Sequence, residues 1–119
     1  MKIESIKPPR MNINEILFAV DNMDWHEGYA FSCDGVDYIL LLDADDEVTP
    51  RSKGAEYFPS TAIHGWDIYI QESLPLEKRK RRLFHNILET NLIDQGYNKE
   101  VANSIALKEE KKVFDKKES

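Results

Sequence analysis

The sequence predicts a single α+β domain in which a small, mainly antiparallel sheet packs against a C-terminal antiparallel hairpin of two helices. Asp34-Gly35 between two apolar runs is the signal of a β-hairpin, here over 29–42. Apolar residues at helical spacing predict two helices, over 74–95 and 98–113. A chain of 119 residues can bury one hydrophobic core and is too short to expect two, so the domain is assigned to 1–119.

The N-terminal segment 1–11 is expected to be a leader or an edge strand, because Pro8-Pro9 fits neither a helix nor a central strand. A short helix is expected over 12–20, capped by Asn12 or Asn14. Its apolar residues recur at helical spacing. This helix could cover the side of the sheet that the C-terminal helices leave open.

The second strand of the hairpin becomes apolar on both faces toward its end, which predicts a central strand covered on both sides. Cys33 lies in the first strand and is the only cysteine, which excludes an internal disulfide and a multi-cysteine zinc site. We interpret Cys33 as a buried or half-buried strand residue rather than a nucleophile.

Two stretches between the hairpin and the next strand have alternative interpretations. The acidic run 43–47 could bind a cation, but it lacks the glycine and distal glutamate of calcium loops and is interpreted as a solvated loop. The segment 49–65 is rich in proline and glycine and is expected to be mostly loop. His64 within it is interpreted as a surface or packing residue, although long loops often border sites.

A strand over 66–71 runs into the long helix, with Ser73 as the expected N-cap and Gly96 as the expected stop. His85 and Glu89 are four residues apart on this helix, so they are neighbours on its surface. Together they could hold one metal ion or one hydrogen-bonded partner.

The second helix carries a matching polar pair. Asn103 and Glu110 are seven residues apart and share a face, so they could meet His85 and Glu89 across the helical hairpin. Glu109 falls on the apolar side of this helix, where a carboxylate needs a partner, and His85 is its natural candidate.

The formal charge of −6 disfavours nucleic acid as a partner. The basic run Lys78-Arg79-Lys80-Arg81-Arg82 is interpreted as a solvated helix face rather than a phosphate-binding patch. No apolar run approaches the roughly 18 residues of a membrane span, and the N-terminus has no secretory pattern. We therefore expect a cytoplasmic protein without a membrane partner.

Three motifs stand out in the C-terminal half: Asp67-Ile68-Tyr69-Ile70, Leu74-Pro75 and Leu83-Phe84-His85-Asn86-Ile87-Leu88-Glu89. Through these motifs the stretch from Trp66 to Glu110 resembles the core of small zincin-like metallopeptidase domains, including the ImmA/IrrE type. In that family a strand leads through a Leu-Pro turn into a helix bearing His-Glu-x-x-His. Gln95-Gly96-Tyr97 and the helix after it are similar to the second helix of compact members of the family.

The resemblance implies a role for each position. His85 stands at the first metal-binding histidine and Glu89 at the second ligand, while Asn103 takes the place of a third histidine. Glu110 or Glu109 stands near the distal carboxylate. Asn86 replaces the general-base glutamate, and an amide cannot accept a proton at neutral pH. Peptide hydrolysis is therefore not expected, and no cofactor is expected, with zinc as the alternative.

Three functions follow as hypotheses. The first is a non-catalytic, zincin-like module that binds a protein or peptide partner or regulates it, with the strand over 67–70 as the edge that pairs with an extended peptide. The second is a metal-dependent hydrolase with ligands His85, Glu89 and Glu110. The third is a partner-binding surface formed by the acidic run 43–47. The sequence indicates neither the partner nor the oligomeric state.

Overall fold

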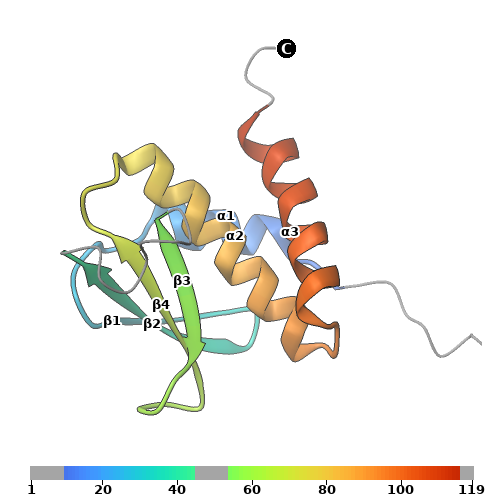
Figure 1. The fold of residues 1–119 in the computed structure, drawn as a ribbon, viewed down its shortest axis with the longest axis horizontal. Coiled ribbons are helices and arrows are strands. Elements are labelled where there is room, and N and C mark those ends of the chain that lie inside the picture. Colours follow the sequence, from blue (N-terminus) through green and yellow to red (C-terminus); the bar gives the residue numbers. More distant parts are fainter. Residues whose placement is uncertain (1–9, 45–53, 116–119) are drawn as a thin grey trace, which may run out of the picture.

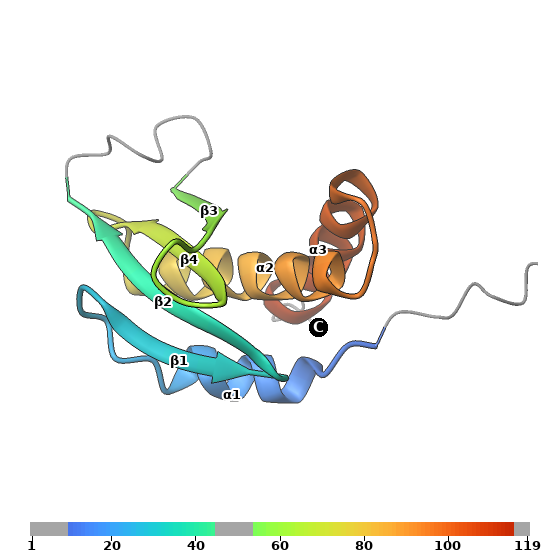
Figure 2. The ribbon, with the colours of Figure 1, turned by 90° about the horizontal axis from the view of Figure 1, so that it is seen from below.

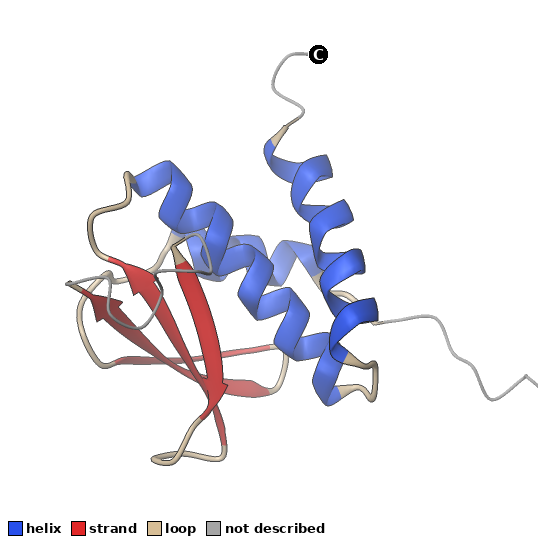
Figure 3. Ribbon diagram, in the orientation of Figure 1, coloured by secondary structure: helices blue, strands red, loops and turns tan. Residues whose placement is uncertain are grey.

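A computed structural model describes residues 10–44 and 54–115, which form one four-stranded sheet and three helices (Figures 1 and 3). This confirms the predicted α+β class and the predicted packing of a helical hairpin on the sheet. Residues 1–9 of the predicted leader and 45–47 of the acidic run lie outside the described residues. The elements, in order, are α1 (Ile13–Asp21), β1 (Tyr29–Cys33), β2 (Val36–Asp43), β3 (Ala55–Pro59), β4 (Gly65–Gln71), α2 (Leu76–Asp94) and α3 (Lys99–Phe114).

The predicted β-hairpin is formed by β1 and β2, which are antiparallel with Cys33 opposite Val36. Asp34 and Gly35 connect them with φ of 52° and 81°. Positive φ at both central residues is the geometry of a type I′ turn, whose twist matches that of the flanking strands. The Asp-Gly pair is therefore the local cause of this hairpin.

The sheet has the strand order β1-β2-β4-β3, with β2 and β4 parallel and β3 antiparallel to β4. The prediction that 49–65 is mostly loop misses one strand, because β3 lies within it. This strand has only five residues, ends in Pro59 and follows Gly54. Proline and glycine are typical of loops, so the composition of the segment does not indicate a strand. Consequently β4 lies inside the sheet, and the prediction that the strand over 67–70 is an edge is wrong. Among the strands that the structure describes, β1 and β3 are the edges.

One face of the sheet carries the core. Tyr38 and Leu40 of β2 and Ile68 and Ile70 of β4 are fully buried beneath the helices. The prediction that the N-terminal helix covers the other side is wrong, because α1 and α2 lie on the same face, behind the strands in Figure 2. The apolar residues of α1 therefore join the core that α2 already fills. Within the described residues no helix covers the opposite face of β2.

The connection between α2 and α3 is a tight one. Gly96 has φ of 107°, and the N–H groups of Gly96 and Tyr97 donate to Ile93 and Leu92 at 2.9 and 3.1 Å. This is the Schellman arrangement, which confirms Gly96 as the helix stop. The Asn98 side chain accepts from the N–H of Val101 at 2.9 Å and caps α3.

The start of α2 differs from prediction. Its N-cap is Pro75 and no side chain caps it, so Ser73 does not take the predicted role. The Arg79 guanidinium instead donates to the carbonyls of Leu74 and Glu72. The side chain of Arg79 therefore fixes the turn between β4 and α2.

Every residue of α2 from Leu83 to Leu92 is buried, although its apolar stripe predicts burial of one face only. The sheet and α1 cover one side of α2, and α3 packs on another side through the small residues Ala102 and Ala106. Several polar side chains of α2 are thereby enclosed. One of them, Thr90, contacts the hydroxyl of Tyr38 at 2.9 Å.

Substitution of Gly65 tests the close approach of β2 and β4. A Cβ atom at Gly65 would lie 2.0 Å from the carbonyl oxygen of Asp37, so Gly65→Ala must separate the two parallel strands. We expect a loss of roughly 2 kcal/mol or more in the free energy of unfolding. Gly35→Ala is the comparison, because that position has strained φ but open space and should cost only about 1 kcal/mol. Equal losses in urea unfolding would show that the close approach is unimportant.

Candidate functional site

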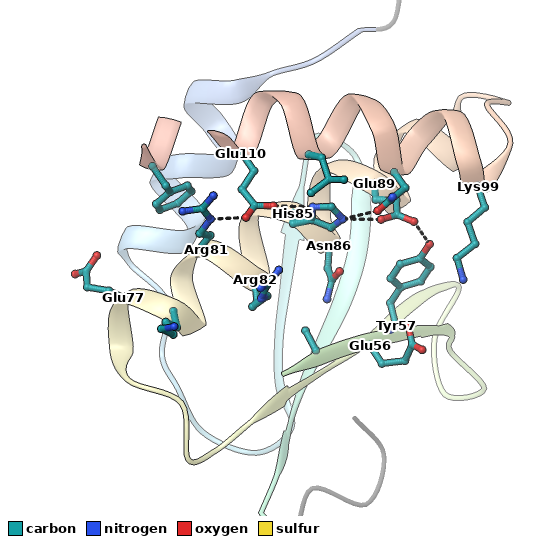
Figure 4. A pocket seen from close by; sticks show the side chains of 15 residues that line it. Glu56, Tyr57, Glu77, Arg81, Arg82, His85, Asn86, Glu89, Lys99 and Glu110 are labelled. Atoms are coloured by element: carbon teal, nitrogen blue, oxygen red, sulfur yellow. Dashed lines mark hydrogen bonds and ion pairs between the residues drawn. The ribbon is translucent and has the colours of Figure 1, made fainter. Parts of the chain in front are cut away.

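A pocket of about 920 Å³ lies between β3, α2 and α3 (Figure 4). Helix α2 forms its floor, β3 one wall and α3 the other. Ala55, Glu56 and Tyr57 line it from β3, while Leu107 and Phe114 supply apolar surface from α3. The volume is that of a ligand-sized cleft.

His85 lies at the centre of this pocket and joins α2 to α3. Its Nδ1 is 2.9 Å from Oε1 of Glu110, and its Nε2 is 2.9 Å from Oε1 of Glu89 and 3.0 Å from Oδ1 of Asn103. The two polar pairs expected from helical spacing thus meet across the helical hairpin. The expected pairing of His85 with Glu109 is wrong, because Glu109 faces Lys112 at 3.4 Å.

Two further side chains complete what we call the His85 cluster. Arg81 donates to Oε2 of Glu110 and also binds Asp115, with Nη1 2.7 Å from Oδ1. Tyr57 donates its hydroxyl to Oε2 of Glu89. The cluster therefore comprises Tyr57, Arg81, His85, Glu89, Asn103 and Glu110, and both oxygens of each glutamate are engaged.

Sequence reasoning missed the roles of Arg81 and Tyr57. Arg81 precedes His85 by one helical turn, so its spacing is a usable signal, although the basic run around it is typical of a solvated helix face. In fact Lys80 pairs with Asp21 at 3.5 Å, and Arg79 and Arg81 bind protein groups, so that interpretation fails for three of the five residues. Tyr57 lies in the stretch expected to be loop and gave no signal.

The charges of the cluster are coupled. Burial opposes the charged form of His85, but the carboxylates of Glu110 and Glu89 outweigh it and raise the pKa of His85 to about 9. Burial alone would raise the pKa of Glu110, yet His85 and Arg81 lower it below its usual value. At neutral pH the cluster thus holds an imidazolium between two carboxylates, so both ring nitrogens donate.

The predicted metal ligands come together, but not in a coordinating arrangement. Glu110 and Glu89 bind opposite nitrogens of the His85 ring, so the three side chains do not converge on one point. Within residues 10–44 and 54–115, no group of three or more His, Cys, Asp or Glu side chains is placed to hold a metal ion. Zinc binding by His85, Glu89 and Glu110, with Asn103 as a weak donor, would require these side chains to turn away from their present partners.

The other residues singled out in the sequence lie outside the pocket. Cys33 is buried, as predicted, and burial, with the charges of Glu15 and Asp34, raises the pKa of its thiol to about 12. Its thiolate is therefore strongly disfavoured. His64 is exposed in the connection between β3 and β4.

Asn86 is the one buried polar residue of the pocket with an unsatisfied group. Its side chain is 6% exposed, and its Nδ2 has no hydrogen-bond partner within the described residues. In Figure 4 it extends from α2 into the pocket, toward β3. Buried amide donors nearly always have a partner, so an unsatisfied one needs an explanation.

None of the family models, curated proteins or solved structures with which the chain was compared matches it. Function therefore has to be inferred from the site itself. Among the described helices, none combines the length and the apolar composition that crossing a membrane requires.

The pKa of His85 predicts a pH-dependent stability. Because the folded-state pKa of about 9 exceeds the ordinary 6.5, the stabilisation is complete below about pH 6.5 and is lost as pH rises through 9. The loss should not exceed about 3 kcal/mol. Urea unfolding of the wild type and His85→Gln between pH 6 and 10 checks this. The difference between them should shrink over that range, and a constant difference would contradict the shift.

Replacing Asn86 should stabilise the protein. Asn86→Leu removes an unsatisfied buried donor, so we expect the free energy of unfolding to rise by about 1 kcal/mol. Thr90→Val is the matched control, because the Thr90 hydroxyl is satisfied by Tyr38 and by the carbonyl of Asn86 at 2.8 Å. That variant should lose about 1 kcal/mol. If Asn86→Leu lowers the free energy of unfolding as much as Thr90→Val does, Nδ2 of Asn86 must have a hydrogen-bond partner in the fold, and the prediction is wrong.

Proposed function

We propose that this chain is a non-catalytic, cytoplasmic module of zincin-like scaffold that binds an extended peptide segment of a protein partner. The peptide would pair with β3 and lie in the pocket between β3 and α3. The observation that carries the proposal is the position of β3, whose outer edge borders the pocket and pairs with no other described strand. An exposed strand edge beside a cleft is the geometry of β-strand addition.

The direction of the backbone groups of β3 follows from its pairing with β4. Gln71 donates to the carbonyl of Gly54 at 2.8 Å, and Ser60 donates to that of Gly65 at 2.9 Å. Since hydrogen-bonding direction alternates along an antiparallel strand, the groups of Ala55, Tyr57 and Pro59 point to the free edge. Consistently, the N–H of Tyr57 donates to the side chain of Glu56 at 3.2 Å and not to β4. The outer edge thus offers a ligand strand the carbonyls of these three residues and the N–H of Ala55, because the N–H of Tyr57 is held by Glu56 and Pro59 has none.

The His85 cluster supports binding over catalysis. A general base needs an unprotonated atom that can reach the substrate. Both nitrogens of His85 donate to carboxylates, and the oxygens of Glu89 and Glu110 accept from His85, Tyr57 and Arg81. These groups neutralise one another and fix α3 beside α2. Their role in the proposal is to hold the wall of the pocket.

The zincin-like relationship is part of the proposal. In its support, the four positions to which the resemblance assigns metal ligands meet at one place in the fold, His85 with Glu89, Asn103 and Glu110. The base position is occupied by Asn86, which faces the same pocket. A scaffold that retains the ligand positions without the base suits a binding domain better than a peptidase.

A library of short random peptides displayed on phage tests the proposal. Wild-type protein should enrich a family of related peptides. Ala55→Pro removes one outward N–H and no N–H that bonds to β4. It should lower the affinity of the enriched peptides at least about tenfold. Ala55→Ser keeps the N–H and is the control, expected to bind as the wild type does. Absence of enriched peptides, or equal binding by both variants, would contradict strand addition at β3.

The alternative, a metal-dependent hydrolase, is favoured by the gathering of His85, Glu89 and Glu110 in one pocket. It predicts about one zinc ion per chain in protein purified without chelators or an affinity tag. His85→Ala and Glu89→Ala should both lose that ion. Elemental analysis of the three proteins decides the matter, and a stoichiometric metal would replace the binding proposal by a search for hydrolysis.

A further inference from the structure

The pocket has an orphan donor at its base. Nδ2 of Asn86 is buried and lacks a hydrogen-bond partner within the described residues, and the side chain extends into the cavity (Figure 4). A donor left in this condition destabilises the fold unless a ligand satisfies it. Its counterpart on the ligand must therefore be a hydrogen-bond acceptor.

The charge around Asn86 indicates what kind of acceptor. Arg82 precedes Asn86 by one helical turn and lines the same pocket, and no described residue forms an ion pair with it. Lys78, also on α2, is likewise unpaired, and Nζ of Lys99 on α3 lies 5.3 Å from the centre of the Tyr57 ring. Three cations thus face the cavity without an anionic partner among the described residues.

The acids of the pocket do not cancel these cations. Glu89 and Glu110 are already bound within the His85 cluster. Glu56 and Glu77 also line the pocket and keep their negative charge. With His85 charged, five cations line the pocket against four carboxylates, so one excess positive charge remains beside the amide donor of Asn86; the cations are Lys78, Arg81, Arg82, His85 and Lys99, and the carboxylates are Glu56, Glu77, Glu89 and Glu110.

We propose that the pocket selects peptides carrying a carboxylate, which Asn86 and Arg82 bind together. This rests on the proposed function and names the ligand chemistry of the same site. A guanidinium presents paired N–H groups that match the two oxygens of a planar carboxylate, and the amide of Asn86 adds one further donor. The carboxylate is either an Asp or Glu side chain of the peptide or its free C-terminus.

The test uses the peptides enriched from the phage library, resynthesised in matched forms. One form carries Asp or Glu, one carries Asn or Gln at the same place, and each is made with a free and an amidated C-terminus. Binding is measured by fluorescence anisotropy. Loss of binding on side-chain neutralisation identifies a side-chain carboxylate, and loss on amidation identifies the C-terminus. Either loss should be at least about tenfold.

Protein variants then place the carboxylate. Arg82→Gln and Asn86→Leu should each weaken the carboxylate form at least about tenfold and abolish the difference between it and its neutral form. Lys80→Gln is the control, since Lys80 belongs to the same basic run but pairs with Asp21 outside the pocket. Thermal unfolding of each variant verifies that it is folded.

The outcomes separate the two proposals. Peptides that bind wild type but not Ala55→Pro, yet show no preference for a carboxylate, overturn this inference and leave the proposed function standing. Carboxylate-dependent binding that survives both Arg82→Gln and Asn86→Leu also overturns it. If a parallel library enriches phosphorylated peptides over peptides that carry a carboxylate, the anion that the pocket binds is a phosphate, and the assignment to a carboxylate is overturned. No binding peptides at all overturns both.

Discussion

An imidazolium held between two carboxylates determines how α3 sits on the rest of the molecule. The helix contacts α2 but makes no comparable contact with the sheet, and its buried residues there are the small Ala102 and Ala106. The half-buried Ile105, Val113 and Phe114 add apolar contacts at the rim of the core, with Phe114 edge-on to Phe84, but apolar packing is non-directional and constrains orientation weakly. His85, bound to Glu89 on its own helix and to Glu110 on α3, supplies the missing specificity. Because α3 forms one wall of the pocket, the pocket depends on this ion cluster.

Such a cluster is costly to bury, and the arrangement shows how the cost is met. Burying charges in a protein interior is favourable only where each is paired and hydrogen-bonded. Here Arg81 and Tyr57 occupy the outer oxygens of the two glutamates, so no carboxylate oxygen of the cluster is left unsatisfied. Removing one member would leave an uncompensated charge. The cluster therefore acts as a unit and cannot easily serve a reaction that consumes one of its groups.

The sequence predicted the features that depend on residues close together in the chain. It did not predict the features that depend on how distant segments pair or pack. The β1–β2 hairpin and the stop at Gly96 follow from turn residues, which are local. Helical spacing placed His85 and Glu110 on faces that could meet, but which carboxylate His85 binds depends on how α3 packs on α2. The strand β3 and the interior position of β4 depend on pairing between separate segments. The face of the sheet on which α1 packs likewise depends on which face α2 covers. At position 86 the sequence shows only that the side chain is an amide, whereas the enclosing fold reveals that its donor is unsatisfied.

The free edge of β3 raises a last question, because exposed edges promote unspecific association between chains. The strand is only five residues long, and it ends in Pro59, which has no N–H to offer. Glu56 covers the N–H of Tyr57 with its own carboxylate. A ligand strand must displace this carboxylate, so backbone pairing alone gains little there. In the proposed complex an additional interaction in the pocket is then required, and this is the role that the proposal gives to the cations beside Asn86.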